Sequence, residues 1–232
     1  MPSPLQSLIA MNPPPPLYFG NRNSLLDCYA VWRHIPYESC CCPESSEGMI
    51  DGALTHFVQL PRLFLAMLQK VKSVISGSVA MTFFEGWSGW EPWDMDVYVP
   101  SFSRDRMLWC FKNSEGYDVV QEEAKNKEDY VANIDIEDVI SLARGGMKID
   151  LVVSSTFVNL LPVFCFHSTA VINFISGDGF FSAYPVLTEE RRSLINANHY
   201  TLFQYTTLHS TSVQGYLKYI ERGYNVQMNP RA

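Results

Sequence analysis

The chain has 232 residues, of which 47% are hydrophobic and 18% are charged. This length and composition predict a folded globular protein with one sizeable core, alone or with a small appendage. The formal net charge of −7 gives little support to a dedicated nucleic-acid-binding protein, which usually presents a basic face, although a local basic patch is compatible with it. The six cysteines show neither the paired spacing of a disulfide framework nor that of a zinc site.

Hydropathy predicts an intracellular protein, cytoplasmic or nuclear, with no membrane partner. The most apolar stretch, Leu151 to Phe166, is interrupted by polar residues and by Pro162, and it is too short to span a bilayer. The N-terminus lacks the basic region of a secretory signal and runs into four consecutive prolines, Pro13 to Pro16.

Residues 1–57 are expected to form an N-terminal extension that contains proline and cysteine. The part up to about Asn23 is proline-rich and is predicted to be loosely ordered. Apolar residues recur at helical spacing between Ser24 and Arg33, which predicts a short helix. The cluster Cys40 to Cys42 falls in a predicted loop, and its pattern indicates no particular chemistry.

Residues 58–176 carry the strongest periodic patterns and are predicted to form the core domain. A helix is expected to begin at Pro61, and its apolar face comprises Leu60, Leu63, Phe64, Met67, Leu68 and Val71. Strands are expected at Val74–Ser76, Trp93–Val99, Tyr117–Gln121, Ile136–Ala143 and Met147–Ser154. The last two are predicted to pair as a hairpin through Gly145 and Gly146. Ser103 is a suitable N-cap for a helix that extends to about Asn113.

The remainder of the chain, 177–232 together with the end of the core, is mostly helical in pattern. Helices are expected at Leu161–Ser176, Thr188–Asn198 and Ser212–Arg222, the last ending at Gly223. The predicted fold class is therefore α/β (α+β), with a mixed β-sheet flanked by helices and a helical C-terminal part.

Acidic residues lie within the apolar predicted strands. Asp94 and Asp96 are two residues apart, so their side chains point to the same face of a strand. Neighbouring carboxylates repel each other and lose hydration unless a cation lies between them. Because carboxylate oxygens are preferred ligands of Mg²⁺, this pair predicts a divalent metal site, and Asp150 in a later strand is a third candidate ligand.

The order of these residues resembles the signature of the nucleotidyltransferase superfamily related to DNA polymerase beta. Its elements are a strand that ends in Gly77-Ser78, the Asp94-x-Asp96 strand, and a third acidic strand residue, Asp150. The resemblance covers about half of the chain and looks closest to functionally unassigned fungal members, which share a Trp-Asp-x-Asp run and the segment found here at 166–169.

This resemblance implies a role for each matching residue. Gly77 and Ser78 correspond to the turn that binds the triphosphate of a nucleotide. Asp94, Asp96 and Asp150 correspond to the metal-binding and catalytic acids, with Mg²⁺, or alternatively Mn²⁺, as the metal. The implied partners are a nucleoside triphosphate (NTP) and an unidentified acceptor, which is a small molecule, a protein or RNA.

Alternatives to this function remain open. The segment after Ser78 lacks the basic residues that the family usually places there, so a catalytically inactive nucleotide-binding or regulatory module is the second hypothesis. A Mn²⁺-dependent glycosyltransferase ranks last, because the first 73 residues do not resemble a doubly wound domain. We interpret Trp87, Trp90 and Trp93 as residues that cap the core, and His167 as a structural histidine.

Overall fold

The computed structural model describes residues 50–85, 89–123, 135–196 and 210–227. The predicted helix at Ser24–Arg33, the Cys40 to Cys42 cluster, the proline-rich N-terminus and Trp87 lie outside these ranges. Within them, every helix is too short or too polar to cross a membrane.

A mixed seven-stranded sheet forms the centre of the structure, in the order β3-β4-β5-β2-β1-β6-β7. Its strands are β1 (Val74–Ser76), β2 (Asp94–Pro100), β3 (Asp118–Glu123), β4 (Ile136–Arg144), β5 (Met147–Ser154), β6 (Asn173–Ser176) and β7 (Phe180–Ser182). Strands β2 and β5 are parallel, and every other neighbouring pair in this sheet is antiparallel. The mixed sheet flanked by helices confirms the predicted fold class.

Helices and a second, small sheet surround this centre. The α-helices are α4 (Pro61–Val71), α5 (Gly77–Glu85), α6 (Arg104–Trp109), α7 (Leu161–Phe164), α8 (Pro185–Glu189) and α10 (Ser210–Glu221). Short 3-10 turns occupy Ser101–Ser103 and Thr169–Val171, and a wider π-type turn, Cys110–Ser114, continues α6. Strands β8 (Arg192–Leu194) and β9 (Asn225–Gln227) pair in parallel as the second sheet.

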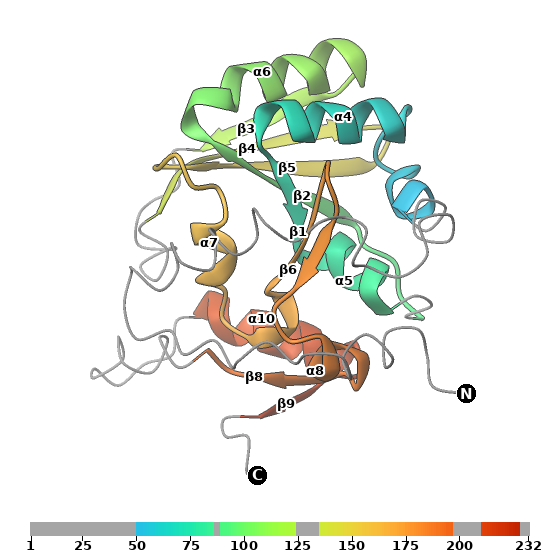
Figure 1. The fold of residues 1–232 in the computed structure, drawn as a ribbon, viewed down its shortest axis with the longest axis vertical. Coiled ribbons are helices and arrows are strands. Elements are labelled where there is room, and N and C mark those ends of the chain that lie inside the picture. The colour runs from blue at the N-terminus through green and yellow to red at the C-terminus, as the bar shows by residue number, and fades with distance from the viewer. Residues whose placement is uncertain (1–49, 86–88, 124–134, 197–209, 228–232) are drawn as a thin grey trace.

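One face of the main sheet packs against α4 and α6, which lie above it in Figure 1. Alternate residues of the central strands are buried there among side chains of both helices. In α4 the buried residues are Phe64, Leu68 and Val71, whereas Leu60 and Leu63, which we predicted on the same apolar face, are exposed. Helix α4 contacts the sheet along a narrower stripe than predicted. Only residues at the spacing i, i+4 and i+7, counted from Phe64, are buried.

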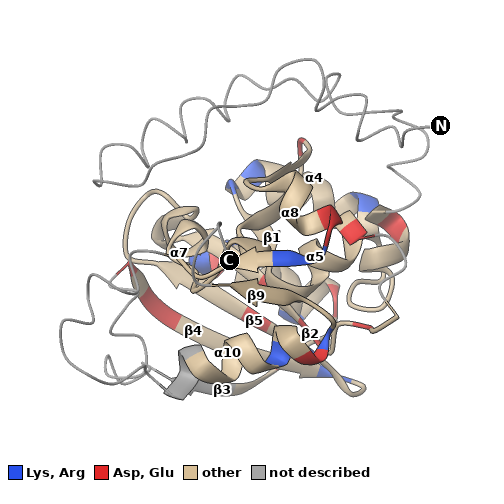
Figure 2. Ribbon diagram, turned by 90° about the horizontal axis from the view of Figure 1, so that it is seen from below, with Lys and Arg blue, Asp and Glu red and all other residues tan. Residues whose placement is uncertain are grey.

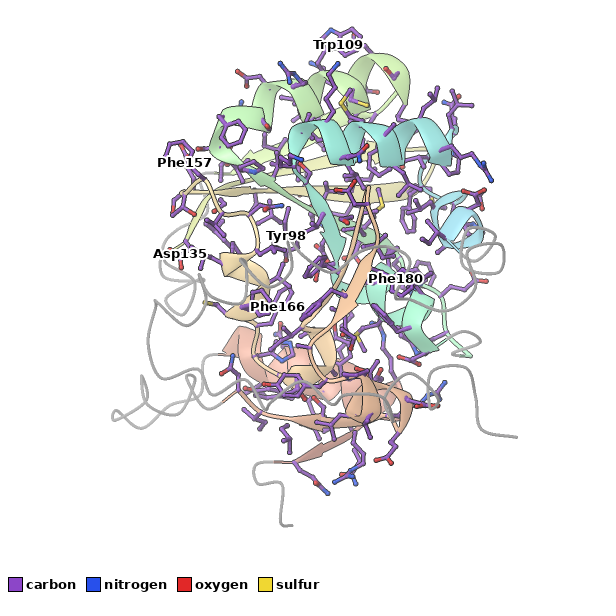
Figure 3. The ribbon with its side chains drawn as sticks, viewed as in Figure 1. Tyr98, Trp109, Asp135, Phe157, Phe166 and Phe180 are labelled. Atoms are coloured by element: carbon purple, nitrogen blue, oxygen red, sulfur yellow. The ribbon has the colours of Figure 1, made fainter. Side chains whose placement is uncertain are left out.

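The opposite face of the sheet is divided into an apolar half and a polar half. In the apolar half, Tyr98, Val139 and Val152 pack against α7 and the segment that follows it. The ring of Tyr98 meets Phe166 edge-on at 5.9 Å between centroids, as the labelled side chains in Figure 3 show. In the polar half, the residues of β2 and β5 that point to this same face are acidic instead of apolar. The candidate site lies in this half.

The predicted helix Leu161–Ser176 is wrong. The structure has only the four-residue α7, a 3-10 turn, and then strand β6, which pairs with β1. This stretch is buried on nearly all sides, so its apolar residues show neither the helical period nor the strand period. The predicted helix Thr188–Asn198 is also wrong in its described part, since 192–194 form β8.

The last predicted helix is confirmed as α10, and Gly223 adopts the left-handed conformation (φ +86°) that ends it. Helices α8 and α10 and the β8–β9 pair lie on the lower side of the main sheet in Figure 1, opposite α4 and α6. The C-terminal part therefore contains one of the expected helices, α10, and adds short strands.

Candidate functional site

The three acidic residues that the sequence singled out lie on one face of the sheet. Because β2 and β5 are parallel with Asp96 opposite Asp150, these two carboxylates project side by side. Asp94 lies two residues before Asp96 and points to the same face. Residues of the opposite alternation, such as Met95 and Ile149, are buried in the core beneath α4 and α6. The structure thus brings all three predicted acids together.

Gly77 and Ser78 adjoin this carboxylate cluster. Strand β1 lies beside β2 with Ser76 opposite Asp96, and the chain turns directly into α5 at Gly77. Gly77 has a φ of +67°, and a Cβ at this position would overlap the Asp96 Oδ2 atom. The hydroxyl of Ser78 donates to the Asp94 Oδ1 atom at 3.3 Å. Only glycine allows the start of α5 to approach Asp96 so closely.

The charges of the cluster interact strongly. Burial, followed by repulsion from Asp94 and Asp150, raises the pKa of Asp96 to about 7. Attraction to Lys218 and Lys148 opposes this rise but does not overcome it. Near neutral pH, an additional cation nearby would therefore favour the ionised form of Asp96.

A lysine of the chain already contacts the third acid. Lys148 precedes Asp150 by two residues on the same face of β5, and its Nζ lies 2.8 Å from the Asp150 Oδ2 atom. The hydroxyl of Ser141, opposite Asp150 on β4, donates to the Asp150 Oδ1 atom. Burial alone would lower the pKa of Lys148, but the hydrogen bond to Asp150 and the nearby carboxylates together raise it. Both oxygens of Asp150 are thus engaged.

Helix α10 contributes groups that the sequence analysis did not assign to the site. Its Lys218 is close enough to Asp96 to stabilise the charged carboxylate, and Tyr219 is buried nearby. Burial raises the pKa of Tyr219 well above its ordinary value; Arg222 opposes this, and Asp96 and Asp94 add to it. Figure 2, seen from below the sheet, shows α10, which carries Lys218, on the near side of the sheet that includes β2 and β5. No local motif could have predicted this, because it depends on how α10 packs.

The acids fit a divalent cation in their chemistry, since carboxylate oxygens are hard ligands and the two lysines relieve the repulsion at Asp96 only in part. Within the described ranges, however, no three histidine, cysteine, aspartate or glutamate side chains are arranged to enclose a metal ion. The two oxygens of Asp150 accept hydrogen bonds from Lys148 and Ser141 instead. An ion bound by all three acids would require the Lys148 contact to open.

The tryptophans predicted to cap the core behave differently from one another. Trp93, immediately before Asp94, is 85% exposed, which contradicts that interpretation. The ring of Trp90 lies under the guanidinium group of Arg222, 3.8 Å from it, and so joins the start of β2 to the end of α10. His167 lies outside any helix and packs edge-on against Tyr216 of α10, which indicates a structural role.

Neither a protein-family model nor a curated protein matches this chain. Among solved structures, the chain is similar to a tRNA-processing enzyme in an apo form, with a TM-score of 0.46 and 12% sequence identity. The aligned region covers 71% of this chain and 43% of that enzyme, so the chain spans less than half of its length. The resemblance to fungal proteins remains a prediction from the sequence.

Proposed function

We propose that this protein is a nucleotidyltransferase-like enzyme that transfers a nucleotidyl group from an NTP to an acceptor in a metal-dependent reaction. The observation that carries the proposal is the register of β2 and β5, which sets Asp96 beside Asp150 on the face that also presents Asp94. Three partly buried carboxylates on neighbouring strands are costly unless they bind a cation. The acceptor is a small molecule, a protein or RNA.

Asp94 and Asp96 would hold the metal ion, Mg²⁺ or Mn²⁺, together with Asp150 once that carboxylate is released by Lys148. When bound, the ion supplies positive charge to the attacking and leaving oxygens of an in-line displacement at the α-phosphorus. Asp150 would accept the proton of the acceptor hydroxyl, and Ser141 holds its carboxylate in place for that task.

The start of α5 would bind the triphosphate. The absence of a side chain at Gly77 leaves the backbone of this turn open beside Asp96, and the N-terminus of a nine-residue helix favours negative charge. Sequence analysis found no basic residue after Ser78, and α5 indeed has none. Positive charge comes instead from Lys148 and Lys218, which lie on β5 and α10.

The test is a screen of labelled NTPs with Mg²⁺ or Mn²⁺, scored for incorporation into the protein itself, RNA and small molecules. Asp94→Asn and Asp96→Asn should each lower turnover at least about 100-fold, because each removes a metal-binding carboxylate. Asp105→Asn is the matched control, since this exposed acid lies on α6 across the sheet. If the purified protein neither binds nor turns over any NTP, the proposal fails.

A catalytically inactive nucleotide-binding or regulatory module is the second candidate. It is favoured by the uncharged α5 and by the Lys148–Asp150 ion pair, which occupies the residue that would accept a proton. This hypothesis predicts that the protein binds an NTP in a manner that depends on Gly77 and Asp96. It also predicts that the bound NTP is not turned over with any acceptor. Binding measured by calorimetry beside the incorporation screen separates the two functions.

A further inference from the structure

We propose that Lys148 is a built-in counter-ion of the carboxylate cluster, which holds Asp150 in the metal-free protein and must release it when a divalent cation binds. This inference rests on the proposed metal site and adds a residue that controls its affinity. Lys148 Nζ lies 2.8 Å from Asp150 Oδ2, which is the distance of a charge-assisted hydrogen bond. A cation that took this oxygen would displace the ammonium group.

The position of Lys148 makes the ion pair part of the site. Its register partner on β2 is Asp94, and its neighbour two residues along the same face is Asp150. An ammonium group there contacts Asp150 and lies beside Asp94, which shares the face of β2 with Asp96. With Lys148 in place, three ionised carboxylates carry a net charge of −2, and without it they carry −3.

Lys148 is also free to move. Its side chain is 47% exposed, whereas that of Asp150 is 15% exposed. The acid is therefore fixed by the sheet and by Ser141, while the lysine can swing towards solvent on its flexible stem. An exchange of Lys148 for an ion needs no movement of the backbone.

The charge at position 148 should set how tightly the site binds a divalent cation. Lys148→Met removes the competing charge and keeps an apolar stem of similar length, so a divalent cation meets a more negative site in which the Asp150 Oδ2 atom is released. Removing a positive charge a few ångströms from the ion strengthens its attraction to the carboxylates, so Mn²⁺ should bind about tenfold tighter or more. Lys148→Arg keeps the charge, pairs with the carboxylate through two hydrogen bonds and should bind Mn²⁺ no more tightly than the parent protein.

The experiment is Mn²⁺ titration of the full chain by calorimetry, with thermal unfolding in EDTA and in Mn²⁺ as a second measurement. In EDTA, Lys148→Met should unfold at a lower temperature than the parent protein because its carboxylates lack their counter-ion. Mn²⁺ should raise its unfolding temperature by more than that of the parent protein. Lys112→Met, at an exposed position in the turn after α6, is the control and should leave Mn²⁺ affinity unchanged.

The outcomes separate this inference from the proposed function. If Asp94→Asn and Asp96→Asn abolish Mn²⁺ binding while Lys148→Met binds as the parent protein does, Lys148 is only a structural partner of Asp150 and the inference is overturned. If the parent protein and all variants bind Mn²⁺ equally or not at all, the metal site and the inference fail together. Tighter binding by Lys148→Met that needs Asp94 and Asp96 supports both.

Discussion

Single residues decide whether the carboxylate cluster can exist. Asp94, Asp96 and Asp150 were predictable because strand alternation and the order of motifs are local properties of the sequence. Lys148 carried a weaker signal, as a lysine two residues before an acid in the same strand, and we did not interpret it. Lys218 carried none, since only the packing of α10 brings it near Asp96.

Gly77→Ala should destabilise the protein by about 2 kcal/mol or more, because it combines a strained positive φ with an overlap of the new Cβ and Asp96. Gly145→Ala separates the two causes. Gly145 also has a positive φ, but nothing lies within 4 Å of a Cβ built there, so its cost should be about 1 kcal/mol. Urea unfolding of both variants measures the difference; equal losses would show that contact with Asp96 is unimportant.

The titration of Asp96 should make stability depend on pH. Its pKa in the folded protein is about 7, above the ordinary value of 3.8, so the folded state binds the proton more tightly than the unfolded state. The free energy of unfolding should therefore fall as pH rises from about 4 to about 7, by at most about 1.4 kcal/mol per pH unit, and then level off.

Asp96→Asn tests this dependence, because it removes the titrating group while keeping the size of the side chain. In EDTA, the variant should gain stability relative to the parent protein as pH rises through that interval. The measurement is urea unfolding at several pH values. A constant difference between the two proteins across the interval would contradict the assignment.

At the scale of elements, the hairpin of β4 and β5, the short β1 and the strand with the acids were all predictable from alternation and glycine positions. The parallel pairing of β2 with β5 was not, because it joins strands separated by more than forty residues. Nor was β6 recognisable, since the buried stretch around it has no period. The site depends on one predictable feature, the alternation, and one unpredictable feature, the pairing.

Helix α10 packs closely against His167 at Gly215. A Cβ there would lie 2.6 Å from the Nε2 atom of His167, so Gly215→Ala should destabilise the protein by about 1–3 kcal/mol. Gly52→Ala is the matched control, because this helical glycine has open space around it and alanine should stabilise by up to about 1 kcal/mol.

Removing the His167 ring should relieve the clash. The loss in Gly215→Ala/His167→Ala is then smaller than the sum of the single losses, as thermal or urea unfolding of the four proteins would show. Additive losses would mean that α10 does not rest on His167.

For the whole molecule, several contacts cross the predicted domain boundary at residue 176. Strand β7 extends the main sheet beyond β6, and Phe181 stacks on Phe174 at 5.1 Å between centroids. Figure 3 places Phe180 beside α5, where it packs against Phe83. The carboxylate of Glu85 is buried against Arg191 and accepts a hydrogen bond from the hydroxyl of Tyr224.

A chain that ends at Ser176 should therefore fail to unfold cooperatively. It would expose the apolar contacts of β6 and α5 and leave Glu85 without its two partners. Thermal unfolding followed by circular dichroism, with the full chain as the comparison, measures this. A single sharp transition in the shortened chain would support the predicted boundary instead.

The stacking of Trp90 under Arg222 gives the molecule an optical reporter. Because Trp90 precedes the strand with Asp94 and Arg222 directly follows α10, any ligand that displaces this helix changes the polarity and quenching around one tryptophan. With the other four tryptophans replaced by phenylalanine, emission from Trp90 would follow the position of α10 in real time.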